Sequence, residues 1–278
     1  MYLLPRAMKR TTRIERKSAS IGKVAGAQSL TRAMSLLKLV AQRPREGMSL
    51  DDVAEASGLH RATAHRLLRA LVAERLLAQD RARRFYPGFE LWLLGKIAGI
   101  RFNLVELAQP CIERLARETG DAALVCTRSG DEVVYLARCE GEYPIKALTL
   151  NVGDRRPLGV SSGSLAILSF LEAPERTRIL ANLSQQLNGF PDFSAELIER
   201  LVRQTRRNGY ALNPVVHERG SEALAVPVLD PQGKPIAAFT LTAISTRMNR
   251  QRIRKLVELM RRESVTLAAA MGNDDGRT

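Results

Sequence analysis

One short segment of the 278-residue chain has the residue pattern of a catalytic serine. Residues 159–163 read Gly-Val-Ser-Ser-Gly, which matches the Gly-x-Ser-x-Gly turn that exposes a nucleophilic hydroxyl. Asp192 and His217 follow in the chain order in which α/β-hydrolases place the other two members of a catalytic triad. This pattern is that of a hydrolase with Ser161 as the nucleophile and His217 as the base.

The segments around this motif do not match that fold. An α/β-hydrolase needs a long parallel sheet, whereas the strand-like runs here come in pairs around tight turns, as in antiparallel hairpins. Residues 155–157, Arg-Arg-Pro, stand where the hydrolase fold has a buried strand. His217 is the only histidine left as a base, because His60 and His65 lie in a basic helix. We therefore predict that the chain is not an enzyme.

The cysteines and histidines do not form a metal site either. Cys111, Cys126 and Cys139 lack the spacing of metal ligands, and their odd number is typical of reduced thiols in the cytoplasm. No apolar run approaches the roughly 20 residues of a membrane span, and no apolar region follows the basic N-terminus. We predict a cytoplasmic protein with no metal, no cofactor and no membrane contact.

Basic side chains are concentrated in the first third of the chain. The formal net charge is +14; residues 1–101 hold 20 Lys and Arg against 8 Asp and Glu, whereas residues 102–278 hold 23 against 21. Such an excess is typical of a domain that meets a polyanion. Arginine can grip guanine in the DNA major groove. The residues expected to face a duplex from one helix are His60, Arg61, Thr63, His65, Arg66 and Arg69.

The elements that would position these side chains follow the order of a winged helix-turn-helix. Apolar spacing predicts a helix from about residue 28 to Val40, a short helix after Ser49, and a third helix that ends near Glu74. Ser49 and Asp52 form a predicted capping box, and Gly58 supplies the turn. A basic hairpin would follow as the wing. Its expected DNA contacts, together with Ser49 as a phosphate contact, are Arg81, Arg83 and Arg84.

The rest of the chain alternates hairpins with helices, so we predict an α+β fold with an antiparallel sheet. Turns at 129–131 and 230–233 join strand-like runs, a further strand is expected at 145–150, and helices are expected at 163–171, 174–187, 194–208 and 250–271. We divide the chain into a disordered basic arm (1–26), a winged helix-turn-helix domain (27–87), a linker helix (88–101), a larger near-neutral domain (102–272) and a disordered tail (273–278).

These segments, in this order, resemble the IclR family of bacterial transcriptional regulators. The resemblance covers roughly residues 28–272, and its most similar segments are 29–33, 50–54, 58–68, 85–88, 152–158, 208–211 and 225–228. It implies a linker helix followed by a GAF-like effector-binding domain. It also implies homodimers or homotetramers that bind palindromic double-stranded operators.

The resemblance further implies where a small-molecule effector would bind. The family's pocket is lined by the segment after Val-Gly-x-x-x-Pro, by the stretch after Gly-Tyr-Ala and by the last hairpin. The matching residues here are Ser161, Ser162, Gly163, Ser164, His217, Ala223, Thr240 and Thr242. The chain departs from common members at Ser164-Leu165, Val216 and Ala223, so the resemblance locates the site without specifying its ligand. We expect an organic or aromatic acid, held by the helix start near Gly163 and by hydroxyl groups.

A third reading is a non-specific nucleic-acid-binding or RNA-binding protein. Aromatic residues make up only 5% of the chain and are sparse among the basic residues, so platforms for base stacking are poorly supported. The sequence favours a sequence-specific, effector-controlled transcriptional regulator. It leaves open the operator, the effector, the sign of regulation and the choice between dimer and tetramer.

Overall fold

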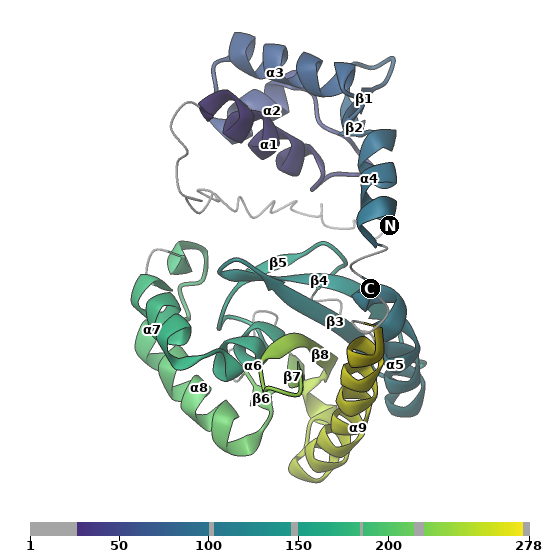
Figure 1. Cartoon of the computed structure of the whole chain (residues 1–278), viewed down its shortest axis with the longest axis vertical. Helices are drawn as coiled ribbons and strands as arrows, with labels where there is room; N and C mark the ends of the chain where they lie inside the picture. The colour runs from purple at the N-terminus through teal and green to yellow at the C-terminus, as the bar shows by residue number, and fades with distance from the viewer. Residues whose placement is uncertain (1–26, 100–102, 146–149, 184–185, 214–219, 275–278) are drawn as a thin grey trace, which may run out of the picture.

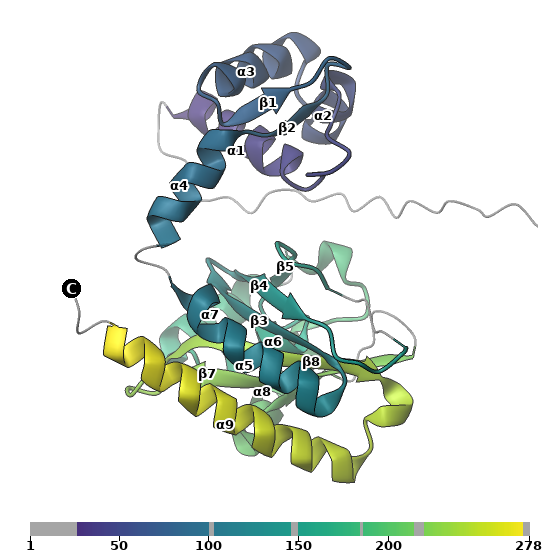
Figure 2. The same ribbon diagram turned by 90° about the vertical axis from the view of Figure 1, so that its right-hand side faces the viewer.

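The computed structural model describes residues 27–99, 103–145, 150–183, 186–213 and 220–274. Figures 1 and 2 show a small helical body with a short hairpin and a larger body built around a sheet. The predicted basic arm and the last four residues of the predicted tail lie outside the described residues. Within the described ranges, no helix combines the length and the apolar character of a membrane span.

The small body is a three-helix unit with a two-stranded wing. Its elements are α1 (Gln28–Val40), α2 (Leu50–Ser57), α3 (Arg61–Ala73), β1 (Leu77–Gln79), β2 (Phe85–Pro87) and the following helix α4 (Phe89–Gly99). Apolar residues three or four apart on α1 and α3 bury one face of each helix in a single core with Phe85 of the wing. A bridge between Met48 and Phe85 ties the wing to the segment before α2.

The larger body contains one six-stranded antiparallel sheet in the order β5-β4-β3-β8-β7-β6. Its strands are β3 (Ala122–Ser129), β4 (Glu132–Cys139), β5 (Arg155–Pro157), β6 (Ala211–Leu212), β7 (Ser221–Leu229) and β8 (Pro235–Ile244). Its helices are α5 (Leu104–Thr119), α6 (Ser162–Phe170), α7 (Ala173–Asn182), α8 (Ala195–Asn208) and α9 (Arg250–Asp274). The predicted α+β fold class is therefore confirmed.

Helices cover both faces of this sheet, and strand alternation assigns residues to each face. Cys126, Tyr135 and Ala238 belong to the core under α6, α7 and α8. Val125 and Phe239 belong to the core under α5 and α9. Residues 240 and 242 of β8 share the parity of residue 238, so β8, one of the two central strands, turns both of them toward the face that α6 covers.

The structure differs from the predicted elements at several ends. β5 was not predicted, because its two arginines are typical of a loop. Within the described residues it pairs only with β4, as an edge strand, and edge strands carry charge and proline readily. α7 ends at Asn182, whose side chain donates to the carbonyl of Arg178, and a separate turn occupies Leu187–Gly189. α9 runs to Asp274, past the predicted end of this helix at residue 271. The predicted strand at 145–150 falls mostly outside the described residues.

Candidate functional site

α3 presents the predicted basic face to solvent. A left-handed Gly58, with φ of +66°, turns the chain between α2 and α3. The buried side of α3 consists of Ala64, Leu67, Leu68 and Leu71. On the other side Thr63 is half-buried, and the exposed residues are His60, Arg61, His65, Arg66 and Arg69. Spacing by four places Arg61, His65 and Arg69 in one row along the helix.

Two residues at the start of α3 already have partners within the protein. The Nε of Arg61 donates to Asp51 Oδ1 at 2.6 Å, and both side chains are exposed. His60 caps the helix, because its Nδ1 accepts from the backbone N–H of Ala62 at 3.4 Å. An exposed ion pair contributes little stability, about 1 kcal/mol at most, so Arg61 can exchange Asp51 for another partner at small cost.

The three arginines of the wing have different surroundings. Arg81 and Arg83 are exposed. Arg84 instead donates through Nε to the carbonyl of Glu46 at 2.7 Å and through Nη2 to the carbonyl of Gly47 at 2.9 Å. Arg84 thus fastens the wing to the loop before α2. We take Arg81 and Arg83 as the arginines that are free to reach a partner.

Ser49 forms the predicted capping box. Its hydroxyl accepts from the N–H of Asp52 at 3.1 Å, and Asp52 accepts from the N–H of Ser49 at 2.9 Å. The hydrogen bond from the Ser49 backbone is the main cause that lowers the pKa of Asp52. Only the hydroxyl hydrogen of Ser49 is left for a phosphate contact.

Arg83 occupies a strained position in the wing turn, and this gives a first test. Its φ is +59°, a conformation that costs a residue with a Cβ atom about 1–2 kcal/mol relative to the usual region. We expect Arg83→Gly to raise the free energy of unfolding by about 0.5–1 kcal/mol, since glycine adopts this conformation freely. The same change should lower the affinity for all DNA duplexes alike. It should also reduce the slope of log affinity against log salt concentration by about 1. Chemical denaturation and salt titrations measure the two effects.

Arg83→Ala is the matched control, because it removes the charge and keeps the Cβ atom. It should reproduce the loss of DNA affinity without the gain in stability. Unchanged DNA affinity in both variants would remove Arg83 from the interface.

A second group of candidate residues meets at the start of α6. Tyr135, Ser161, Ser164 and Thr240 lie together here, and Thr242 follows two residues along β8 on the same face; we call these five residues the hydroxyl cluster. Ser161 caps α6, and its hydroxyl lies 3.0 Å from that of Tyr135 and 3.0 Å from that of Ser164. The hydroxyl of Ser162 donates to the carbonyl of Ala223 on β7 at 2.6 Å.

The two threonines of the hydroxyl cluster stand out by their lack of partners. Thr240 is fully buried and Thr242 is 2% exposed. Neither hydroxyl oxygen makes a well-formed hydrogen bond to the described part of the chain, although Thr240 lies beside Tyr135 and lowers the pKa of that tyrosine. A buried hydroxyl without a partner costs about 1–3 kcal/mol, so it calls for a ligand or a function.

Sequence reasoning missed Tyr135, Cys126 and Arg156. Tyr135 is fully buried, and burial is the main reason that its pKa is raised, so it stays a neutral donor. Burial also raises the pKa of Cys126 to about 12, so it stays a thiol. The charge of Arg156 on β5 also lowers the pKa of Tyr135, although Arg156 pairs with Asp154 at 3.7 Å. The only hint of Tyr135 in the sequence is a tyrosine within an apolar strand, because a buried tyrosine needs a polar partner for its hydroxyl.

Gly163 brings the backbone of α6 against the sheet. A Cβ atom at this position would lie 2.7 Å from Cys126 Sγ and 2.9 Å from Thr240 Oγ1. We expect Gly163→Ala to lower the free energy of unfolding by about 1–3 kcal/mol through overpacking. Adding Cys126→Ala should recover part of the loss, because it removes the closest atom. Equal denaturation midpoints for Gly163→Ala and the wild type would contradict this packing.

The described residues around Ser161 do not form the catalytic site of a hydrolase. Ser161 follows an edge strand of an antiparallel sheet, and its hydroxyl is held in the capping box of α6. Asp192 is exposed, and His217 lies outside the described residues. Among the residues that the structure describes, no group of His, Cys, Asp and Glu could hold a metal ion.

Comparison with known proteins matches both bodies of the chain. The model of the IclR helix-turn-helix domain matches residues 29–81, and that of the bacterial transcriptional regulator IclR C-terminal matches residues 99–268. The transcriptional regulator BhcR of Paracoccus denitrificans is 29% identical over 233 residues, which cover 82% of this chain and 81% of BhcR. KipR of Bacillus subtilis is 23% identical over 249 residues, which cover 88% of this chain and 97% of KipR.

A solved structure shares the fold over nearly the same length. It is an IclR homologue from Microbacterium hydrocarbonoxydans, complexed with 4-hydroxybenzoate. It is 21% identical to this chain, with a TM-score of 0.70, and the match covers 87% of this chain and 98% of that one.

Proposed function

The chain belongs to the IclR family of bacterial transcriptional regulators, and we propose that it binds a specific operator through α3 and the wing, under the control of a small organic acid. It is a transcriptional regulator and not an enzyme. We further propose that residues 27–87 bind DNA in the cytoplasm, that 88–101 link the domains and that 102–272 bind the effector.

The observation that carries the DNA-binding part is the free face of α3. Arg66 and Arg69 are exposed and have no ion-pair partner within the described residues, and Arg61 is bound only by an exposed aspartate. An α-helix with such a face fits the major groove, while a wing reaches the backbone or the minor groove beside it. Selection of duplexes from a random pool by the full chain tests this. We expect one enriched motif with twofold symmetry; enrichment without a motif, or preference for RNA, would contradict it.

Pairing of two chains through α4 follows from its exposed apolar side chains. None of the α4 residues is buried, and Phe89, Trp92 and Ile97 are each more than half exposed. We propose that these side chains pack against a second copy, since a homodimer would match a twofold operator. We expect Ile97→Glu to shift the protein from dimer to monomer in light scattering. Val265→Glu on α9, where the side chain is 70% exposed, is the control that should stay dimeric. A monomeric wild type would refute the pairing.

The hydroxyl cluster is the proposed effector site. The hydroxyls of Thr240 and Thr242 make no well-formed hydrogen bond within the described residues, so they can donate to a carboxylate or accept from a hydroxyl. Backbone N–H groups at the start of α6 suit an anionic group as well. The ligand of the Microbacterium homologue, 4-hydroxybenzoate, has both a carboxylate and a hydroxyl group. We therefore propose a small hydroxylated or aromatic acid as the effector, and His217 and Ala223 as further wall residues.

A further inference from the structure

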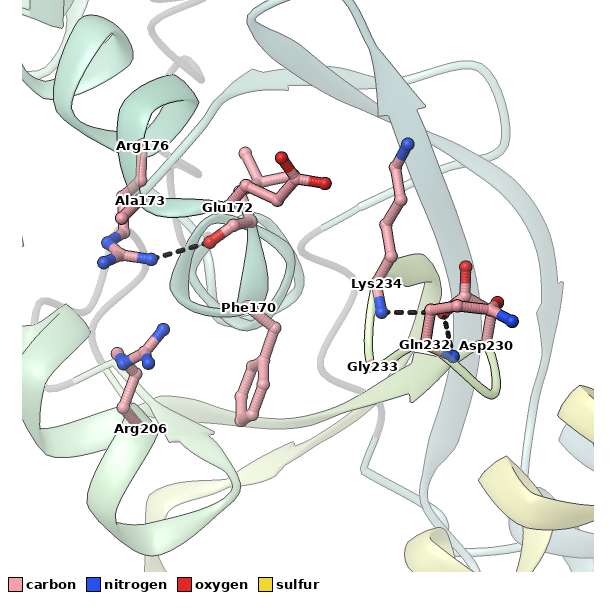
Figure 3. A pocket seen from close by; sticks show the side chains of 10 residues that line it. Phe170, Glu172, Ala173, Arg176, Arg206, Asp230, Gln232, Gly233 and Lys234 are labelled. Atoms are coloured by element: carbon pink, nitrogen blue, oxygen red, sulfur yellow. Dashed lines mark hydrogen bonds between the residues drawn. The ribbon is translucent and has the colours of Figure 1, made fainter.

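A pocket at the far end of α6 has no role in the proposed function. It has a volume of about 510 Å³ and lies where α6 ends, α7 begins, α8 passes and the β7–β8 turn comes close. Figure 3 shows Arg176 and Arg206 together on one side, the ring of Phe170 beside them, and Lys234 across the pocket. The hydroxyl cluster lies at the other end of α6, about 13 Å away for a helix of nine residues, so the two sites are separate.

The two arginines are fixed in place by backbone carbonyls from the end of α6. Arg176 Nη1 donates to the carbonyl of Leu171 at 2.6 Å, and Arg206 Nη1 donates to the carbonyl of Ser169 at 2.9 Å. A guanidinium has five N–H donors, so each arginine uses only a fraction of its capacity in these bonds. The two acceptors are two residues apart, which holds the two guanidinium groups near each other.

Neither of these guanidinium groups forms an ion pair in the described part of the chain, although neighbouring arginines do. Arg178, on the same helix as Arg176, pairs with Asp131 at 2.6 Å, and Arg203, on the same helix as Arg206, pairs with Glu199 at 3.2 Å. Burial and the like charge of Arg206 lower the pKa of Arg176. Two arginines placed against each other without a carboxylate favour an anion between them.

The acidic groups of the pocket do not fill this role. Asp230 accepts from the backbone N–H groups of Gln232 and Lys234, at 3.0 and 2.8 Å, so its carboxylate is held within the β7–β8 turn. Glu172 is exposed beside the start of α7, and in Figure 3 its carboxylate points away from Arg206. Lys234 adds a third positive charge at the rim.

We propose that this pocket binds a small oxyanion, a phosphate or carboxylate group of a multiply charged metabolite, between Arg176 and Arg206. The planar forks of the two guanidinium groups can each give two parallel hydrogen bonds to such a group. Phe170 offers an apolar surface for the rest of the molecule. The site is distinct from the proposed effector site, and its failure would leave the proposed DNA and effector functions untouched.

Calorimetric titration of the full-length protein tests the site, with pyrophosphate and citrate as probes and ionic strength held constant with potassium chloride. We expect saturable binding, and we expect Arg176→Gln and Arg206→Gln each to weaken it about tenfold or more, as loss of a charge-assisted pair does. Lys234→Gln should weaken it less. Arg203→Gln is the matched control on α8 and should bind like the wild type.

The outcomes separate this proposal from a purely structural role of the arginines. Tighter binding of pyrophosphate assigns the site to phosphate compounds, and tighter binding of citrate assigns it to polycarboxylates. If the arginines only cap α6, Arg206→Gln will lower the melting temperature equally with and without the probes, and the proposal fails. It also fails if the Arg176→Gln, Arg206→Gln double variant retains all of the binding, which would then belong to the basic N-terminal domain.

Discussion

Replacing Arg61 or Arg66 by alanine is expected to weaken binding to the selected operator by about 1–3 kcal/mol, a factor of about 5 to 150 in Kd. Both side chains are exposed at the first two turns of α3, the part of a recognition helix that meets base edges. Loss of a bidentate contact to guanine also relaxes the preference at one base pair. Fluorescence anisotropy with the operator and with a scrambled duplex of the same length measures both effects.

The scrambled duplex separates base reading from phosphate contact. We expect the ratio of specific to non-specific affinity to fall for Arg61→Ala and Arg66→Ala, but to stay constant for Arg83→Ala, which removes a charge that every duplex meets. Arg203→Ala on α8 is the control, and it should bind both duplexes like the wild type. Wild-type operator affinity in the Arg61→Ala, Arg66→Ala double variant would refute the assignment of α3 as the recognition helix.

Thr242→Val is expected to stabilise the protein and to abolish its response to the effector. Thr242 is buried and its hydroxyl has no hydrogen bond in the described residues, so the isosteric valine removes a desolvation cost of about 1–3 kcal/mol. The same hydroxyl is a proposed donor to the ligand. A gain in stability with a loss of regulation is the pattern of a polar group kept for binding. Thermal unfolding gives the first effect, and operator binding with added acid gives the second.

Thr127→Val is the matched control for this prediction. Thr127 lies on β3 in the same sheet, but its hydroxyl donates to the carbonyl of Ile236 at 2.7 Å. The same substitution should therefore lower the free energy of unfolding by about 1 kcal/mol and keep the effector response. Ser161→Ala should weaken the response as Thr242→Val does, while ligand-free operator binding stays intact. A normal response in Thr242→Val would move the effector site elsewhere.

Much of the fold could be predicted because it depends on local patterns. Apolar spacing of three and four predicted α1 and α3, and the capping box of Ser49 and Asp52 formed as its short spacing indicates. Hairpin turns around short apolar runs predicted the antiparallel pairing of β3 with β4 and of β7 with β8. β5 was not predicted, because an edge strand does not need an apolar face and the residues of β5 have the composition of a loop.

The sites were harder to predict because their contacts join distant parts of the chain. Arg83 and Arg84 are equivalent in sequence, but Arg84 is held by a carbonyl 38 residues earlier, which no local pattern reveals. Thr240 and Thr242 were identified only through the family resemblance. Tyr135 reads as an ordinary strand residue, and its place beside Ser161 depends on how α6 packs on the sheet. The proximity of Arg176 and Arg206 likewise depends on how α6, α7 and α8 pack together.

The most direct test of the central claim couples the two proposed sites in one measurement. Operator affinity of the full-length protein is titrated against small aromatic and hydroxylated acids, each first shown by thermal shift to bind the protein. We predict that at least one such acid changes the operator Kd by about 5- to 150-fold, the range of typical allosteric coupling, and is recovered unchanged. Acids that bind and leave operator affinity unaltered, or that are consumed, would contradict the claim that this chain is an effector-controlled transcriptional regulator.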